Sequence, residues 1–408
     1  MSSPKLNRRL TSLDATFLYL EKKECPMHIG STSVFNGEIT LEELKNHVSD
    51  RLHLIPRYTQ KVVPDPFNIA HPTWEEDSEF DISNHIFEIG GKKPLDFEGL
   101  AKLAGEILTP VMDRSKPLWE LHLVPRTNFG GSAMIAKVHH AMVDGISGVD
   151  LIKILFDISP QPEPVPPKPE SAPKPPPLDP TRRLLDSLLG SMEEGMNRFF
   201  EMQAGMLYLA SSLLDPKSAE KLPHFAGVLP SVAAPPVILP FNKPCNGERL
   251  LAWSEYPFSE ARRIKNALGG TVNDVVLTIL SESVKRYVLH HGGETKGKNV
   301  RFMMPVSLRQ KDKRGSMGNL ISILPVEIPL EFSGFEERFK YINSKTSIMK
   351  ETKLAESFLT IGAMYSLIPA PLQSAIGQIA DTPVPPFNMV ATNVPGPQIP
   401  LYLVGKSL

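Results

Sequence analysis

Two adjacent histidines, His139 and His140, end an apolar run and are followed closely by Asp144 and Gly145. Imidazole titrates near neutral pH, so a histidine held at the end of a rigid strand is suited to act as a general base. Such a base takes the proton of an alcohol while the alcohol oxygen attacks an activated acyl carbonyl. The segment therefore favours acyl transfer to a hydroxyl group.

Other interpretations apply to the same residues. A metal site is disfavoured, because adjacent residues on a strand point to opposite faces and no third ligand follows at a zinc-binding spacing. A structural role stays open, since a histidine can be satisfied in a core and Asp144 can cap the helix expected after it. The chain has no GxSxG sequence, so direct transfer is a simpler scheme than a serine-bound acyl intermediate.

The elements that position these residues follow from β-branched content and from apolar residues at helical spacing. We expect strands near 133–139, 301–306 and 321–328, so that the histidines end the first strand. Helices are expected near 41–52, 97–110, 146–157, 259–267, 273–290 and 334–350. The sequence has no GxGxxG or GxxxxGKS/T loop, so neither a dinucleotide site nor a P-loop is indicated.

A proline-rich stretch divides the chain. Eleven of the 21 residues from Pro160 to Pro180 are proline, which favours an extended connector over a helix or an inner strand. A proline-rich ligand for a partner domain is the alternative. A second proline-rich segment, 229–244, closes the insert. We therefore expect an N-terminal half at 1–158, a connector with helices at 159–243 and a C-terminal half at 244–408.

Within the connector, apolar side chains recur in steps of three and four from Leu185 to Leu213. That spacing predicts a helix with one apolar face. The face either packs on the protein's own core or lies on a lipid surface, where adaptable methionine and phenylalanine side chains contact acyl chains. The pattern alone leaves both alternatives open.

Composition narrows the class of protein. The 44 basic and 45 acidic side chains give a net charge of −1, which argues against a nucleic-acid binder driven by bulk charge. Cys25 and Cys245 are the only cysteines and lie far apart in the sequence, so neither a disulfide framework nor a CxxC zinc site is expected and a reducing cytoplasm is compatible. We predict no targeting signal and no membrane-spanning helix.

The HHxxxDG pattern of His139, His140, Asp144 and Gly145 resembles the active-site motif of the CoA-dependent acyltransferase superfamily. The chain is most similar to the bacterial wax ester synthase/diacylglycerol acyltransferase family, because further segments match it in order. These segments are LTSLDATFLYLE at 10–21, PMHIG at 26–30, Pro117-Leu118-Trp119 with Glu120, Gly270 to Val275 around Asn273-Asp274, Met317-Gly318-Asn319, and Asn393 to Pro397.

The resemblance implies a mixed α/β fold of two chloramphenicol-acetyltransferase-like halves, each with a mostly mixed sheet and helices, and an active-site tunnel at their interface. It implies that His140 is the general base and that His139 packs behind it. Asp144 is expected to pair with a basic side chain and orient the loop. Gly145 is expected to allow a close turn that a Cβ would block.

The remaining motifs have a local interpretation and an implied one. From the residues alone, Pro117, Leu118 and Trp119 are typical of a core, and Asn273 is typical of a helix cap. By resemblance, the first three support substrate positioning and Asn273 donates to the developing oxyanion. The resemblance also places Asp274 near the reaction centre, and it makes Asp274 and Asn319 candidates for substrate binding or support. Asn393, Pro395, Gly396 and Pro397 are expected to border the acyl or CoA channel.

The implied activity is transfer of a long-chain acyl group from acyl-CoA to diacylglycerol or to a long-chain alcohol, without a metal or redox cofactor. The expected partner is a membrane or lipid-droplet surface, with the protein cytoplasmic and peripherally bound. The resemblance implies a further strand and helix after the Asn393 to Pro397 motif, so the C-terminal half is expected to lack the family's last segment. The alternatives are a condensation-like acyltransferase that uses a carrier-bound donor and a non-catalytic lipid-droplet-binding protein.

Overall fold

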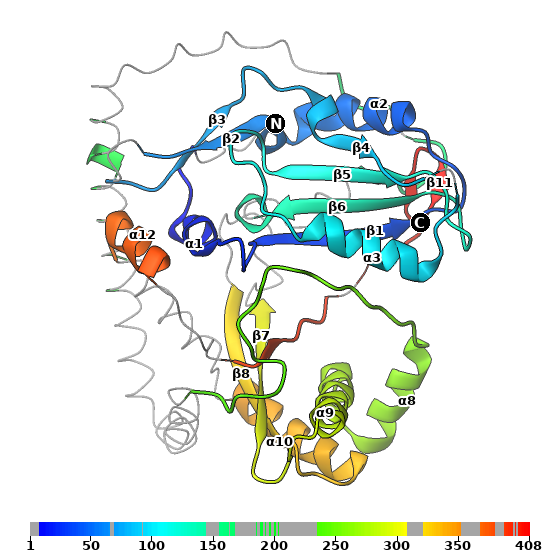
Figure 1. Cartoon of the computed structure of the whole chain (residues 1–408), viewed down its shortest axis with the longest axis vertical. Helices are drawn as coiled ribbons and strands as arrows, with labels where there is room; N and C mark the ends of the chain where they lie inside the picture. Colours follow the sequence, from blue (N-terminus) through cyan, green and yellow to red (C-terminus); the bar gives the residue numbers. More distant parts are fainter. Residues whose placement is uncertain are drawn as a thin grey trace.

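The structure is a computed structural model of the whole chain. It describes residues 8–65, 69–91, 93–143, 155–162, 164–167, 235–307, 321–351, 368–379, 387–394, 396 and 399–408, with eight further positions between 185 and 203. Figure 1 shows two groups of elements: the upper one holds β1, β4, β5 and β6 with their helices, and the lower one holds β7, β8, α8, α9 and α10.

A mixed sheet forms the first half. Strands β1 (His28–Val34), β6 (Ala133–His139), β5 (Trp119–Val124) and β4 (Ile86–Glu88) lie in the order β1-β6-β5-β4. The β1–β6 and β6–β5 pairs are antiparallel, and the β4–β5 pair is parallel. Because β6 lies second in the sheet and is paired on both sides, the histidines at its end start from a rigid position (Figure 1).

Both faces of this sheet are covered. Alternate residues of β6 belong to two different cores: Ile135 packs with helix α3 (Phe97–Leu108), and Met134 packs in a larger core with residues of helix α2 (Leu41–Arg51). This alternation follows from the two-residue period of a strand. The larger core continues under the short 3-10 helices η1 (Leu52–Leu54), η2 (Pro56–Thr59) and η3 (Ile82–Asn84) and beside the hairpin of β2 (Gln60–Val63) and β3 (Thr73–Glu76).

Helix α1 (Ser12–Leu20) covers the end of β6. Thr11 caps the helix by accepting a hydrogen bond from the Asp14 N–H. The helix packs on the 3-10 turn η4 (His140–Met142) and on helix α12 (Ala370–Ile379), where Ser12 Oγ donates to Gln373 Oε1 at 2.9 Å. One short helix thus contacts both the histidine turn and a segment from the far end of the chain.

The second half has a smaller sheet. Strands β7 (Asn299–Ser307) and β8 (Ile321–Pro329) are antiparallel, and β9 (Met389–Val390) pairs parallel to β7. Helices α8 (Phe258–Leu268), α9 (Val272–His290) and α10 (Phe335–Glu351) belong to the same half, and α9 packs against the other two. The buried residues of this half form a core of their own.

Two segments that follow the connector pack on the first half. Leu251 and Trp253 lie against the core of α3. The short hairpin of β10 (Tyr402–Leu403) and β11 (Lys406–Ser407) inserts Leu401 and Leu403 into the larger core of the first sheet. Figure 1 accordingly places the C-terminus beside that sheet, so residues from both ends of the chain stabilise the first half.

The predicted mixed α/β class and three predicted strands are confirmed. The helices expected near 41–52, 97–110, 259–267, 273–290 and 334–350 are also present. Most of the helix expected at 146–157 lies outside the described residues. The described connector residues 160–162 and 164–167 form neither helix nor strand, and those between 185 and 203 are helical. Among the described residues, no helix is both long and apolar enough to cross a membrane.

Candidate active site

His139 is the last residue of β6, and its imidazole is completely buried. Its main-chain N–H donates to Leu118 O at 3.0 Å. Its Nδ1 accepts a hydrogen bond from the Ala141 N–H at 3.1 Å, so the ring caps the turn that begins at His140. An accepting Nδ1 assigns the proton of the neutral ring to Nε2. Nε2 lies 3.4 Å from Glu21 Oε1, a close polar contact that is longer than a well-formed hydrogen bond.

Glu21 connects three segments below the histidines. Oε1 accepts a hydrogen bond from the Met27 N–H at 3.0 Å, and Oε2 accepts one from Arg114 at 2.9 Å. Burial by itself raises the pKa of this carboxyl, but the contacts with His139, Met27 and Arg114 outweigh burial and lower the pKa to about 2. Glu21 is therefore a buried carboxylate that stays ionised and fixes the chain around His139.

His140 occupies a different environment. Its main-chain N–H donates to Met27 O at 2.9 Å, and its ring stacks on Phe17 of α1 with centroids 3.9 Å apart and an 18° angle between the planes. The residue is half-buried, whereas His139 is buried. The imidazole of His139 is thus enclosed beneath the turn, whereas that of His140 is oriented by Phe17 and partly accessible to solvent.

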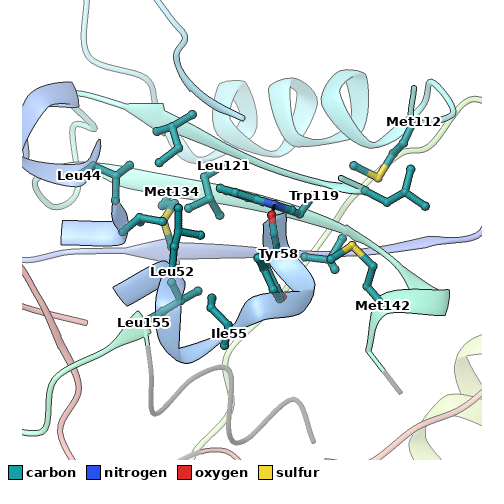
Figure 2. Close-up of a cluster of buried hydrophobic side chains, with 14 of the residues drawn as sticks. Leu44, Leu52, Ile55, Tyr58, Met112, Trp119, Leu121, Met134, Met142 and Leu155 are labelled. Carbon is teal, nitrogen blue, oxygen red and sulfur yellow. Dashed lines mark hydrogen bonds between the residues drawn. The ribbon is translucent and has the colours of Figure 1, made fainter. Parts of the chain in front are cut away.

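The rest of the η4 turn is anchored in the core. Ala141 and Met142 are buried in the larger core of the first half. Figure 2 shows Met142 at one side of this core, with Trp119 and Tyr58 between it and Leu44. Because interiors are close-packed, such anchors restrict movement of the turn that carries His140.

The Pro117-Leu118-Trp119 motif contributes packing and one direct link to the histidines. The Trp119 indole N–H donates to Tyr58 O at 2.8 Å, and the ring stacks on His85 with centroids 4.5 Å apart. All three residues are buried. The local interpretation as a core is therefore confirmed. The motif also adjoins the histidine turn, because the Leu118 carbonyl accepts the His139 N–H.

In the second half, the predicted helix start is present but the predicted cap is wrong. Thr271, and not Asn273, is the N-cap of α9: its side chain accepts from the Asp274 N–H, and the Asp274 carboxylate accepts from the Thr271 N–H in return. Asn273 is the second residue of the helix. A T-x-x-D capping box accounts for the shift, because Thr271 has its reciprocal partner three residues later.

Asp274 is buried and fully engaged. Oδ2 accepts from the Thr271 N–H at 2.7 Å and the Thr271 hydroxyl at 2.8 Å, and Oδ1 accepts from the Thr346 hydroxyl at 2.7 Å. Asn273 beside it is half-buried, and its Oδ1 accepts a hydrogen bond from Asn393 Nδ2. With Oδ1 occupied, the Asn273 amide presents Nδ2 as its donor.

The site residues expected from sequence thus form two described groups. His139 and His140 lie with Leu118 and Trp119 in the first half, and Asn273, Asp274 and Asn393 lie together in the second. Gly396 is exposed. Asp144, Gly145, Asn319, Pro395 and Pro397 lie outside the described residues.

Sequence reasoning missed four residues of the histidine frame: Phe17, Glu21, Met27 and Arg114. All except Arg114 fall in segments 10–21 and 26–30, which carried the family resemblance but gave no role for any side chain. Their partners are distant in sequence, so no local spacing indicates them. Within the described ranges, no group of three or more His, Cys, Asp or Glu side chains has a metal-binding arrangement.

Comparison with known proteins identifies the family. Residues 10–276 match the wax ester synthase/diacylglycerol acyltransferase catalytic domain, and residues 317–408 match the C-terminal domain of the same family. A probable diacylglycerol O-acyltransferase of Mycobacterium tuberculosis, tgs2, is 30% identical over 398 residues, which cover 95% of this chain and 84% of the relative. A second from that organism, tgs1, is 25% identical and covers 97% of this chain and 83% of its own.

Two solved structures share the fold. The wax ester synthase/diacylglycerol acyltransferase of Marinobacter aquaeolei VT8 is 20% identical with a TM-score of 0.60, over 98% of this chain and 85% of that chain. The first condensation domain of the calcium-dependent antibiotic synthetase is 13% identical with a TM-score of 0.52, over 99% and 84%. The family matches span both halves of the molecule, and the chain belongs to the wax ester synthase/diacylglycerol acyltransferase family of O-acyltransferases.

Proposed function

We propose that this chain transfers a long-chain acyl group from acyl-CoA to the hydroxyl of diacylglycerol or of a long-chain alcohol, with His140 as the general base. The observation that supports this role most strongly is the contrast between the two histidines. His139 is enclosed and engaged at Nδ1, whereas His140 is partly accessible and oriented by Phe17. A base needs both a fixed orientation and access to the proton that it takes.

The proposed reaction is a direct transfer. His140 takes the hydroxyl proton, and the alcohol oxygen forms a bond to the thioester carbonyl carbon. The tetrahedral intermediate then breaks its carbon–sulfur bond, and the protonated His140 returns the proton to the CoA thiolate. The thioester is already activated, so this scheme uses no covalent acyl-enzyme, metal or redox cofactor.

Asn273 is proposed to stabilise the negative oxygen of the intermediate. Its Oδ1 is engaged by Asn393, so Nδ2 is the donor that it presents to a substrate oxygen. Asp274 positions it by fixing the first turn of α9 through Thr271 and Thr346. A donor held in place before the reaction is effective because no reorganisation is needed when the charge develops.

The lipid substrates favour a protein that binds an interface. Leu185, Leu189, Met192 and Met196 recur at helical spacing, and each is between 53% and 67% exposed. We propose that this face contacts a membrane or lipid-droplet surface. The double variant Leu189→Glu/Met192→Glu is expected to lose co-sedimentation with anionic phospholipid vesicles. The control is Leu250→Glu, which changes a leucine outside this face that is 95% exposed. This control should still co-sediment with the vesicles. Equal sedimentation of both variants and wild type would contradict this assignment.

Thiol release by purified protein tests the proposed activity. Palmitoyl-CoA is supplied with dioleoylglycerol, with hexadecanol or without acceptor, and a parallel arm supplies palmitoyl bound to an acyl carrier protein. We expect thiol release that requires both the CoA donor and an acceptor and that disappears in His140→Ala. The acceptor that gives the faster release identifies the product. Release only from the carrier-bound donor would assign a condensation-like reaction. Folded wild-type protein with no turnover from either donor would overturn the catalytic role.

A further inference from the structure

The side chain of Arg249 reaches from the segment after the connector into the loop below the histidines. Nη2 donates to Pro26 O at 2.5 Å, and Nη1 donates to His28 O at 3.2 Å. These two carbonyls flank Met27. The Met27 carbonyl accepts the His140 N–H at 2.9 Å, and the Met27 N–H donates to Glu21 at 3.0 Å. The peptide that holds the turn of His140 is thus fixed from both sides.

The main chain around Arg249 is itself tightly placed. The Arg249 N–H donates to Thr109 Oγ1 at 3.0 Å. A Cβ at Gly105 would lie 2.3 Å from Arg249 O, and one at Gly247 would lie 2.3 Å from Lys23 O. Because neither approach tolerates a side chain, the segment lies directly on α3 and on the loop after α1. Arg249 therefore starts from a fixed backbone.

We infer that Arg249 is a positioning residue for the transfer reaction, which orients the turn of His140 by fixing the Met27 peptide. The inference rests on the proposed role of His140. A planar guanidinium with several donors can bridge two carbonyls, whereas a lysine ammonium offers a single point of charge. Small displacements of a catalytic group cost up to about 100-fold in rate. The structure thus couples a segment beyond the connector to the catalytic turn of the first half.

The test compares Arg249→Gln and Arg249→Lys with a matched buried arginine. Arg338 is buried in the second half and donates to Phe332 O at 2.9 Å and to Glu282 at 2.5 Å. Arg338→Gln therefore removes similar bonds without touching the histidine loop. For each variant, kcat and both KM values are measured per folded molecule, together with hydrogen exchange of peptides from residues 137–143.

We expect kcat to fall about 10- to 100-fold in Arg249→Gln, with either KM changed less than threefold. Arg249→Lys should fall between this variant and wild type. Exchange in 137–143 should accelerate only in the Arg249 variants, and Arg338→Gln should lower Tm with kcat within twofold of wild type. Unchanged exchange and unchanged kcat in Arg249→Gln would overturn the inference, as would a rise in KM alone.

The exchange measurement separates this inference from the proposed activity. If wild-type protein shows no acyl transfer, the proposed reaction is overturned. Faster exchange in 137–143 of Arg249→Gln would in that case still support the contact of Arg249 with the turn. Normal wild-type turnover with Arg249→Gln indistinguishable from Arg338→Gln in every readout would leave the proposed reaction intact and overturn the role of Arg249.

Discussion

Glu21 in the first half contacts His139, next to the proposed base, and Asp274 in the second adjoins Asn273; both are buried carboxylates. Asp274 finds one partner, Thr271, three residues away and the other, Thr346, on helix α10. The partners of Glu21 are Met27, Arg114 and His139, which span more than a hundred residues of sequence. The second half therefore positions Asn273 mainly through a local helix cap, whereas the first half positions the turn of His140 through tertiary packing.

The two halves also differ in their buried histidines, although the first half buries the basic side chains of Arg51 and Lys137 as well. Five histidines are buried in the first half: His28, His47, His71, His85 and His139. In the described second half, the buried basic side chains are Arg301 and Arg338. Burial lowers the pKa of a histidine and leaves an arginine charged. We therefore expect acid to affect the first half more than the second.

Asn273→Ala tests the contribution of the second half to chemistry. We expect kcat to fall about 100- to 1000-fold with little change in either KM, because a preorganised oxyanion donor acts in the transition state. Asn343→Ala is a control that removes an asparagine amide which donates to Gly269 O at 3.1 Å. Steady-state kinetics of acyl transfer give the comparison. If kcat of Asn273→Ala falls by less than threefold, Asn273 has no part in the mechanism.

Glu21→Gln tests the frame of the first half. The substitution keeps the shape of the side chain but removes the charge that faces His139 and Arg114, so we expect kcat to fall about 10- to 100-fold. Loss of buried hydrogen-bond partners should also lower the free energy of unfolding by about 1–3 kcal/mol. Glu106→Gln is the control, because Glu106 is exposed on α3. Wild-type kcat in folded Glu21→Gln would show that the frame does not affect catalysis.

Mild acid should destabilise the first half. Burial lowers the pKa of His28 to about 4 and also lowers the pKa values of His47 and His85. The folded state then binds fewer protons than the unfolded state between about pH 6.5 and pH 4, so this stability is complete above pH 6.5 and is lost as pH falls. Protonation of His28 in the unfolded state alone lowers the free energy of unfolding by about 2 kcal/mol at pH 5, relative to neutral pH.

Hydrogen exchange followed from pH 7 to pH 5 measures this difference. Peptides from the first sheet should exchange faster as pH falls, after correction for intrinsic rates, and peptides from α9 and α10 should change less. His28→Gln should reduce the acid sensitivity of the first half. Equal acceleration in both halves, or faster exchange in α9 first, would contradict the expected difference between them.

Thr271→Ala tests the local cap and has the smallest expected effect. Removal of an N-cap hydroxyl costs about 1 kcal/mol of stability. Asp274 keeps its bonds to the Thr271 N–H and to Thr346, so we expect kcat to change less than threefold. Denaturant unfolding and steady-state kinetics check both values. A large loss of kcat with normal stability would mean that the Thr271 hydroxyl, and not the bonds that Asp274 keeps to the Thr271 N–H and to Thr346, orients the start of α9.

The same contrast explains what could be predicted from sequence. The ends of β6 and α9 follow from local patterns, and both carry candidate site residues. The T-x-x-D box at Thr271 is equally local and places the cap two residues before Asn273. Glu21, Phe17, Arg114 and Arg249 carry no local signal, because each acts through a partner that only the fold brings near. The Trp119 environment is similar: burial was predictable, but its contact with His85 was not.

The proposed mechanism requires His140 to take the proton of the acceptor alcohol. The most direct test is a single-turnover measurement in which enzyme in excess of palmitoyl-CoA is mixed with the preferred acceptor and the ester product is followed in time. If His140 is the base, His140→Ala should form ester at least about 100-fold more slowly than wild type. Its affinity for a non-reactive palmitoyl-CoA analogue should stay within threefold of wild type. Ester formation by folded His140→Ala within tenfold of the wild-type rate would show that His140 is not the general base.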